Sequence, residues 1–390
     1  MSIWHYCLKP PLALLCAFTM ALLMLSLSTS VVAQQTRGQA VDWLYEVDQF
    51  VPDQSDRARL AAGQRSLLRV LSRTTGLASI PRSATVAKAL TSPDRYYTKY
   101  VYFDPRDLDA EQRGLIDNAS SGADASLALR FDFQPAAIKQ LARDAQLPTW
   151  WSRRPLTMVW MVLDEPSGRK IVDHSAVELR SELDARAQQR GLPTMLPLMD
   201  LQDSVQVNPA VVWGRFTDVL DQASERYMAS QYLLGRFSVQ EILGQRLYTG
   251  EWLVRSGDGE SSQYLRGVDR DNLVRTGIDM ATRHVLDQHL VFTNTPRQHD
   301  LVVRGITGLQ AYAGLLDYLQ SLEFIDSVML LGLQADALTL RVNTVATDRQ
   351  LQSLLIDDGQ FDTAPQPPQI LELPFNESLT NLEFVWLGRS

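Results

Sequence analysis

Hydrophobic and polar residues recur along the chain with the periods of helices and strands. The most regular segment is residues 53–76, "DQSDRARLAAGQRSLLRVLSRTTG", in which apolar and small residues lie three or four positions apart. Ser55 or Asp53 is suited to cap the start of a helix, and Gly76 favours the left-handed conformation that ends one. The pattern predicts a helix over this segment.

The remaining patterns of residues 36–150 mix strands with helices. "VDWLYEV", "RYYTKYVYF" and "LALRFDF" have the aromatic and β-branched content of strands. A short helical segment follows Pro81, and "QPAAIKQLARDAQL" predicts a helix with Pro135 in its first turn. We therefore expect an N-terminal α/β module over residues 36–150.

A second module is predicted over residues 151–293, with the element order β-α-β-α-β-β-β-α. Its strands are "LTMVWMVLD", "LPTMLPLMD", "QYLLGRFSVQ", "RLYTGEWLVRS" and "SQYLRGV". Its helices lie in "HSAVELRSELDARAQQRG", in "RFTDVLDQASERYM" and in "DNLVRTGIDMATRHVLDQHL". This order predicts a sheet covered by helices.

Residues 297–390 predict a C-terminal β-α-β-β-α module that ends with a further strand, "LEFVWLG". Thr307 and Gln310 have the spacing of a capping box, and "SVMLLGL" is expected to pair with "ALTLRV". The order is that of a ferredoxin-like unit. The fold class is thus predicted as α+β, with two or three mixed modules whose sheets are covered by helices.

The first 33 residues have the composition of a secretory signal. Lys9 precedes an apolar run from Leu12 to Leu27, and small residues end the segment at Ala33. We expect cleavage after Ala33 and a periplasmic location, while an uncleaved anchor stays an alternative. The two cysteines of the chain both lie in this segment, so the mature protein has no disulfide and no thiol nucleophile. No later segment is apolar enough for a membrane span.

The charge of the chain argues against nucleic acid as a partner. Its 390 residues carry a formal net charge of -8, so no basic field covers the whole surface. Four arginines nevertheless form a ridge of fourfold spacing on the first helix: Arg57, Arg65, Arg69 and Arg73. Because like charges repel at this spacing, they require acidic neighbours, solvent or a bound anion.

Motifs for catalysis and for cofactor binding are missing from the sequence. There is no G-x-S-x-G and no phosphate-binding glycine loop. The S-x-x-K match at Ser167 lies in a segment typical of a turn, and His284 and His289 have the wrong spacing for a zinc helix. No cofactor and no metal are therefore expected. Carboxylate pairs, for example Asp164–Glu165 with Asp173, stay open, because a glycosidase needs no fixed sequence spacing.

The segment "LPTWWSRRPLTMVWMV", residues 147–162, holds the candidate binding residues Trp150, Trp151, Arg153 and Arg154. Exposed tryptophans beside arginines would stack a sugar or hold an anion. Alternatively, the segment is a hinge that seats the second module on the first, since it joins a helix end to a strand start at Pro155.

Three of these segments together resemble a known family, the exported proteobacterial proteins termed domain of unknown function 2066. The family pattern joins an arginine-bearing first helix that ends in Gly, a strand with Phe-Asp, and a Leu-Pro-x-Trp, Arg-Pro, Trp sequence. The matching residues are Arg57, Gly76, Phe131, Asp132, Leu147, Pro148, Trp150, Arg154, Pro155 and Trp160. The resemblance covers residues 40–270 and implies an exported protein, with no catalytic residues to carry over.

The sequence supports two hypotheses about function. The first is a non-enzymatic periplasmic factor for envelope binding or assembly, whose partner is an envelope protein or a cell-wall component. The order of the second module is similar to periplasmic modules of the Tol-system propeller protein and of lipoprotein activators of cell-wall synthases, which favours this role. The alternative is a carboxylate-dependent hydrolase acting on peptidoglycan or another glycan.

Overall fold

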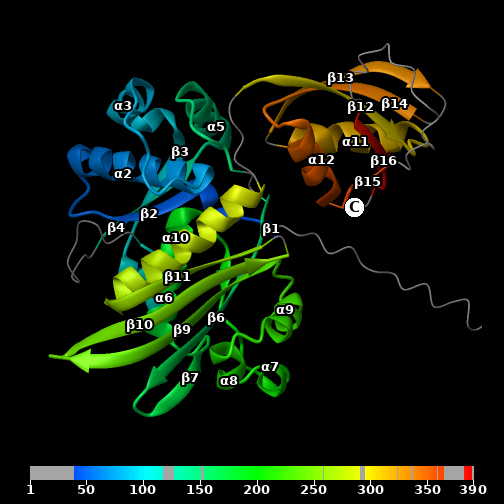
Figure 1. Cartoon of the computed structure of the whole chain (residues 1–390). Helices are drawn as coiled ribbons and strands as arrows, with labels where there is room; N and C mark the ends of the chain where they lie inside the picture. The colour runs from blue at the N-terminus through cyan, green and yellow to red at the C-terminus, as the bar shows by residue number, and fades with distance from the viewer. Residues whose placement is uncertain are drawn as a thin grey trace, which may run out of the picture. The chain divides into compact units, whose positions relative to one another are not determined.

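The computed structural model of the chain is an α+β protein (Figure 1). It describes residues 39–116, 127–150, 153–257, 259–289, 295–322, 324–334, 337–357, 359–363 and 382–388. These residues form eleven α-helices and three main sheets, each mixed or antiparallel. All of them belong to one unit, Thr36–Ser390, and the predicted module boundaries inside it stay predictions. The predicted signal segment, residues 1–33, lies outside the described residues.

Within the described ranges, no helix is both long and apolar enough to cross a lipid bilayer.

The first sheet has three antiparallel strands in the order β2-β4-β3, namely β2 (Glu46–Phe50), β4 (Ala128–Phe133) and β3 (Tyr97–Phe103). The helical elements of this part of the chain are η1 (Asp42–Tyr45), α2 (Asp56–Thr75), α3 (Ala84–Thr91), η2 (Pro93–Arg95), η3 (Pro105–Asp107), α4 (Ala110–Leu115) and α5 (Pro135–Asp144). Leu67 and Val70 of α2 share one buried cluster with Val47 and Phe131 of the sheet and with Ile138 of α5. This core holds α2 and α5 on the sheet.

The predicted first helix is confirmed, with both of its predicted ends. The Ser55 hydroxyl accepts a hydrogen bond from the backbone N–H of Ala58, and Gly76 ends α2 with φ of 70°. The strand predicted for "VDWLYEV" is wrong in its first part, because residues 42–45 form the 3-10 helix η1. That turn buries Leu44 and brings the carbonyl oxygen of Trp43 within reach of Arg73.

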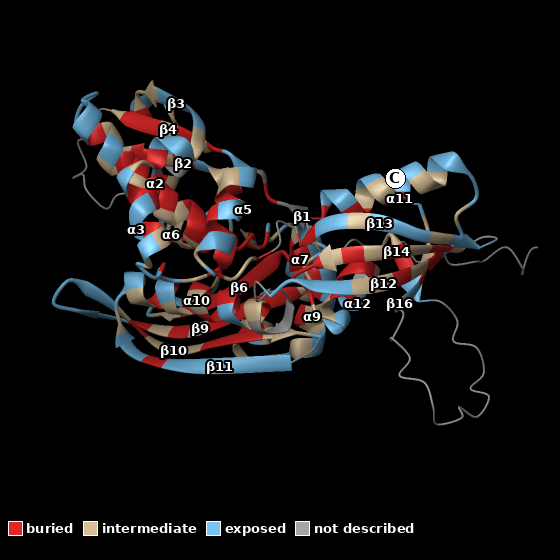
Figure 2. Ribbon diagram, turned by 90° about the horizontal axis from the view of Figure 1, so that it is seen from above, coloured by how far each residue is buried: buried red, intermediate tan, exposed pale blue. Residues whose placement is uncertain are grey.

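The second sheet is mixed and has the strand order β11-β10-β9-β6-β7, with β8 also paired to β6. Its strands are β6 (Thr157–Glu165), β7 (Gly168–Val172), β8 (Thr194–Met195), β9 (Gln231–Ile242), β10 (Gln245–Ser256) and β11 (Gly259–Val268). A short ladder joins β5 (Arg153–Arg154) to β1 (Gln39–Ala40). In Figure 2, β6 is buried along most of its length and the edge strand β11 is largely exposed.

Helices cover both faces of this sheet (Figure 1). One face packs on α6 (Val177–Arg190) and α10 (Arg270–His289), and the other on α8 (Pro209–Trp213) and α9 (Thr217–Glu225). Helix α7 (Leu201–Gln206) lies against α9. Successive side chains of β6 point to opposite faces, so Met161 faces the first cluster and Trp160 the second. The indole N–H of Trp160 donates to the hydroxyl of Ser224 at 2.9 Å.

Trp252 on β10 fixes α10 on the sheet. It is fully buried, and its indole N–H donates to the carbonyl oxygen of Leu273 at 2.9 Å. Its ring lies against two glycines, Gly235 on β9 and Gly277 on α10, where an added Cβ would overlap it. Side chains smaller than alanine are therefore needed on both sides of the indole.

Three short elements of this module escape prediction. Strand β7 follows a hairpin turn at residues 166–167, so the turn expected at Ser167 is present but its second strand was not expected. Helices α7 and α8 have six and five residues, too few for a helical period to show. Their N-caps, Asp200 and Asn208, were the available signals.

The C-terminal sheet has five strands in the order β13-β14-β12-β16-β15. Its elements are β12 (Arg297–Arg304), α11 (Leu309–Ser321), β13 (Ile325–Gln334), β14 (Ala337–Thr344), α12 (Asp348–Asp357), β15 (Phe361–Thr363) and β16 (Leu382–Trp386). The predicted pairing of β13 with β14 is confirmed. A ferredoxin-like unit is not confirmed, since β16 runs parallel to β12 and separates it from β15.

The predicted capping box at Thr307 is wrong. Gly308, with φ of 104°, is the N-cap of α11 and provides no side-chain hydrogen bond. The same T-x-x-Q spacing forms a capping box at the next helix, where Thr347 and Gln350 exchange hydrogen bonds of 3.0 and 3.3 Å. The glycine after Thr307 explains the difference, because it adopts a backbone conformation that an alanine or a leucine rarely takes.

We predict that Gly277→Ala lowers the thermal stability of the protein. The new Cβ would lie 2.6 Å from the indole of Trp252, and such overpacking costs roughly 1–3 kcal/mol. The matched control is Gly314→Ala in α11, where nothing lies within 4 Å of the added Cβ and alanine favours the helix by up to about 1 kcal/mol. Circular dichroism melts compare the two variants. A Gly277→Ala protein as stable as Gly314→Ala would contradict the packing described for Trp252.

Candidate functional site

The predicted site residues Trp150 and Arg154 are buried. Their side chains are 1% and 0% exposed, and the guanidinium carbon of Arg154 lies 3.8 Å from the centre of the Trp150 ring. The guanidinium donates to the carbonyl oxygen of Gly191 after α6, while the backbone N–H of Trp150 donates to Thr74 O of α2 at 2.8 Å. This geometry favours the hinge interpretation for both residues.

The structure describes one of the other two predicted site residues, Arg153. Arg153 is half-buried in β5, whereas Trp151 lies outside the described residues. A ligand platform made of all four residues therefore stays a prediction.

We call the contact of α2 with Trp150, Arg154 and the end of α6 the hinge. Arg73 is its central residue. Its guanidinium donates to Trp43 O at 2.7 Å, to Glu46 O at 2.6 Å and to Gln188 O at 2.9 Å, and it lies 5.3 Å from the ring centre of Trp43. Burial lowers the pKa of Arg73 to about 9, so the group stays charged at neutral pH. Gln188 lies in the last turn of α6, where free carbonyl groups and the helix dipole favour a cation.

The hinge requires glycine at position 191. Gly191 ends α6 with φ of 72°, and an added Cβ would lie 2.5 Å from Arg73 O and would overlap Arg154. A larger residue would therefore separate α2 from the end of α6.

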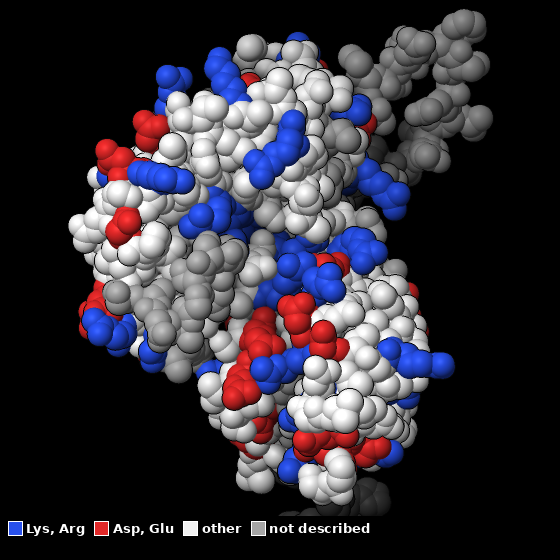
Figure 3. Space-filling model, turned by 90° about the vertical axis from the view of Figure 1, so that its left-hand side faces the viewer, with Lys and Arg blue, Asp and Glu red and all other residues white. Residues whose placement is uncertain are grey.

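A pocket of about 320 Å³ lies beside the hinge, between α2, the loop that follows α2, and the last turns of α6. Five arginines line it: Arg65, Arg69, Arg82, Arg186 and Arg190. Among the described residues of its wall there is no aspartate and no glutamate. On the face drawn in Figure 3, Lys and Arg side chains gather near the middle of the view. We call this site the arginine pocket.

Two arginines of the arginine pocket share one carboxylate, and a third donates to a neutral amide. Arg186 donates to both carboxylate oxygens of Asp279 at 2.8 and 2.7 Å, and Arg190 Nε lies 3.3 Å from the same carboxylate. Arg65 Nε donates to the neutral amide of Gln49 at 3.2 Å. One carboxylate, that of Asp279, therefore serves two of the five guanidinium groups.

Arg190 carries a buried charge that its contacts among the described residues satisfy only in part. Its side chain is 6% exposed, and its Nη1 has no hydrogen-bond partner among the described residues. Burial lowers the pKa of Arg190, because removing the guanidinium from water disfavours its charged form. A buried donor without an acceptor is costly, so a ligand oxygen at this position would satisfy it.

The predicted ridge of four arginines on the first helix is divided by the fold. Arg57 is exposed, Arg65 and Arg69 line the arginine pocket, and Arg73 is buried on backbone carbonyls. Arg82, Arg186 and Arg190 were not expected at a site. Arg186 and Arg190 lie four positions apart on α6 just as Arg65 and Arg69 do on α2, and that repeated spacing was the available signal.

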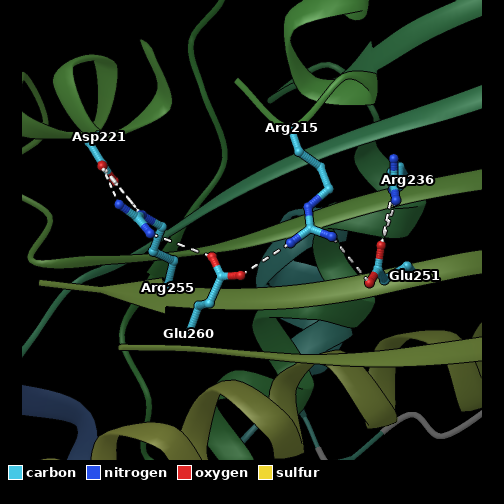
Figure 4. A network of polar contacts seen from close by, with 6 residues as sticks. All are labelled: Arg215, Asp221, Arg236, Glu251, Arg255 and Glu260. Atoms are coloured by element: carbon cyan, nitrogen blue, oxygen red, sulfur yellow. Dashed lines mark hydrogen bonds and ion pairs between the residues drawn. The ribbon is translucent and has the colours of Figure 1, made fainter. Parts of the chain in front are cut away.

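Carboxylates elsewhere are held by arginines. Figure 4 shows a chain of six alternating charges that joins strands β9, β10 and β11 to α9 and the turn before it: Asp221, Arg255, Glu260, Arg215, Glu251 and Arg236. Successive members lie 3.2, 3.5, 3.3, 3.7 and 2.8 Å apart. Burial acts to raise the pKa of Glu251, but hydrogen bonds from Arg236 and Ser262 and the nearby arginine charges leave it lowered. Glu251 is thereby kept ionised.

The acids considered for hydrolysis are also engaged, two of them by arginines and one by a backbone N–H. Asp164 lies 3.3 Å from Arg169, Glu165 pairs with Arg246, and Asp173 accepts from the backbone N–H of Ser175 at 2.9 Å. Desolvation raises the pKa of Glu182, which lies 2.7 Å from Arg270. A general acid must be free to reach the substrate and to give it a proton, and these contacts engage the acids named in the hypothesis.

Two histidines of the described residues, His284 and His299, make local contacts. His284 Nε2 lies 3.1 Å from the hydroxyl of Ser256, a pair that the sequence spacing did not indicate, and His299 contacts Asp348 and Ala346 O. In the part of the chain that the structure describes, no group of three or more His, Cys, Asp or Glu residues is placed to hold a metal ion.

Comparison with known proteins gives one family match. Residues 39–151 are similar to the family described as Domain of unknown function (DUF8605). The resemblance to domain of unknown function 2066 is therefore wrong. Several residues that carried it, among them Gly76, Phe131 and Trp160, are buried packing residues, and such positions recur in unrelated α+β proteins.

No curated protein matches this chain. A solved structure titled "Crystal structure of uncharacterized protein" is 9% identical and covers 35% of this chain and 91% of its own. Its TM-score is 0.15, and it supports no statement about this fold.

We predict that Arg73→Met destabilises the protein by at least about 3 kcal/mol, because three buried carbonyl groups lose their charged donor. Arg57→Met is the matched control, since Arg57 is exposed on the same helix and should change stability by less than about 0.5 kcal/mol. Urea unfolding followed by circular dichroism measures both. Equal midpoints for the two variants would show that Arg73 does not hold the hinge.

Proposed function

We propose that this protein is an exported, non-enzymatic factor for binding or assembly in the bacterial cell envelope, and that it recognises an anionic group of its partner. The arginine pocket is the observation that carries the proposal, since five arginines line one cavity of about 320 Å³. Guanidinium groups bind carboxylates and phosphates through paired hydrogen bonds. Such a site is built to hold an anion.

The contacts of the acidic residues favour binding over the alternative, a carboxylate-dependent hydrolase. The candidate acids Asp164 and Glu165 each pair with an arginine, so their carboxylate oxygens are already engaged. An inverting or a retaining glycosidase needs one protonated acid beside the scissile bond. The arginines of the pocket supply charge but no group that donates or accepts a proton near neutral pH.

An envelope location is supported by the sequence of residues 1–33. A protein that is acidic overall, with a net charge of -8, and that carries a local cluster of arginines is suited to recognise one anionic group while it avoids general binding to polyanions. The partner is an envelope protein or a cell-wall component that bears such a group.

We predict that the chain is exported and cleaved after Ala33. Expression with its own N-terminus in a Gram-negative cell, followed by osmotic release and mass spectrometry, should yield a protein that starts at Gln34. A variant with charged residues in place of the apolar run should remain in the cytoplasm at full length. Recovery of the uncleaved wild-type chain in the cytoplasm would refute the proposed location.

We predict that multivalent anions raise the melting temperature of the purified protein through the arginine pocket. A ligand at 100 times its Kd stabilises the folded state by about 2.7 kcal/mol. Differential scanning fluorimetry with phosphate, sulfate and acetate, against sodium chloride of equal ionic strength, measures the effect. Arg82→Ala should reduce the shift.

Arg57→Ala is the control for that measurement, because both side chains are exposed and only Arg82 lines the pocket. If no anion raises the melting temperature more than sodium chloride does, or if both variants respond like the wild type, the proposed function is wrong.

A further inference from the structure

We propose that the ligand of the arginine pocket is a small phosphomonoester, with its phosphate group held between α2 and α6 and its organic part against apolar side chains. The inference rests on the proposed function and names the chemical class of the bound anion. Three features of the pocket carry it, namely the directions from which its arginines come, its balance of charge, and its size.

The arginines reach the cavity from three segments of the chain. Arg65 and Arg69 are one turn apart on α2, Arg186 and Arg190 are one turn apart on α6, and Arg82 comes from the loop after α2. Residues four apart on a helix lie on the same face, so each helix presents a pair of guanidinium groups. An anion between them receives donors from more than one side.

This arrangement matches a phosphate group better than a carboxylate. A carboxylate is planar, carries one charge, and is satisfied by one guanidinium that donates two parallel hydrogen bonds. A phosphomonoester has three terminal oxygens arranged around phosphorus and carries a charge of about -1.5 to -2 at pH 7. Only the phosphate offers separate oxygens to donors on opposite walls.

The charge balance of the wall also favours a dianion. Five arginines line the cavity, and Asp279 contacts two of them, Arg186 and Arg190. Arg190 Nη1, on a side chain that is 6% exposed, has no acceptor among the described residues. A ligand that brings one negative charge would leave more of this repulsion in place than a ligand that brings two.

The size of the cavity indicates that the anion carries a substituent. A volume of about 320 Å³ lies at the lower end of small-molecule sites, which span roughly 300–1,000 Å³. Leu68, Ala78 and Ile80 form part of the same wall. They provide apolar contact beside the arginines, which suits the short carbon chain of an ester and gives nothing to a free ion.

The chemistry is shared by a soluble phosphate ester and by the phosphomonoester headgroup of a lipid, so the experiment has an arm for each. Isothermal titration calorimetry on the purified full chain compares glycerol 3-phosphate, inorganic phosphate and acetate. Sedimentation with vesicles compares phosphatidic acid, a phosphomonoester lipid, with phosphatidylglycerol, a charged phosphodiester lipid.

We expect glycerol 3-phosphate to bind more tightly than inorganic phosphate and at least about tenfold more tightly than acetate. Arg82→Ala should weaken the binding of glycerol 3-phosphate by roughly 10- to 100-fold, as the loss of a charge-assisted pair requires, whereas Arg57→Ala should leave it unchanged. Selective sedimentation with phosphatidic acid vesicles would identify a lipid as the source of the ester. Binding of glycerol 3-phosphate without sedimentation would identify a soluble one.

Two results would overturn the inference and still leave the proposed function standing. Acetate that binds as tightly as phosphate would show a simple anion site, and glycerol 3-phosphate that binds less tightly than inorganic phosphate would show that the cavity excludes the ester. If none of the anions binds in a way that depends on Arg82, the proposed function fails together with the inference.

Discussion

The burial of one cation, the Arg73 guanidinium, constrains the rest of the hinge. A charge removed from water is tolerated only where donors meet acceptors in good geometry. Arg73 finds them in three backbone carbonyls, those of Trp43, Glu46 and Gln188. The 3-10 turn of η1, the last turn of α6 and the glycine at position 191 all follow from the need to bring these oxygens to one place.

The same requirement accounts for the position of the arginine pocket. Because Arg73 fixes α2 against the end of α6, the arginines one and two turns before it on α2, Arg69 and Arg65, line the same cavity as Arg186 and Arg190. Arg73 donates to three backbone oxygens, whereas Nη1 of Arg190 in the pocket wall has no acceptor among the described residues. Elsewhere, as in the alternating chain from Asp221 to Arg236, each charge has an opposite neighbour. The donor without an acceptor on Arg190 is the reason why we propose a ligand in this pocket.

Much of the fold was predictable from the sequence, because helices such as α2 have a long helical period and strands such as β6, β9 and β14 are long apolar or alternating runs. Short elements such as η1, α7 and β7 were not predictable, since four to six residues hold no clear period. A neighbouring residue can also change the outcome of a motif, as the two T-x-x-Q segments show. Thr347 and Gln350 form a capping box, whereas Gly308, next to Thr307, starts α11 without one.

The candidate site was harder to predict than the fold. The rare aromatic residues of the segment 147–162 predicted a binding site there, yet Trp150 and Arg154 are buried. The arginines that share a cavity are separated by more than a hundred residues, from Arg65 to Arg190. Only the tertiary structure shows that the two pairs on α2 and α6 line one pocket.

The hydrogen bond from Arg73 to Gln188 O crosses the end of the segment that matches a known family. The segment that matches a known family ends at residue 151, but one acceptor of Arg73 and two arginines of the pocket lie beyond it, on α6. If that segment were transferred alone to another protein, it would carry a buried charge without its third acceptor and half of a binding site. The structural unit around Arg73 is thus longer than the segment that matches the family, because it includes the last turns of α6.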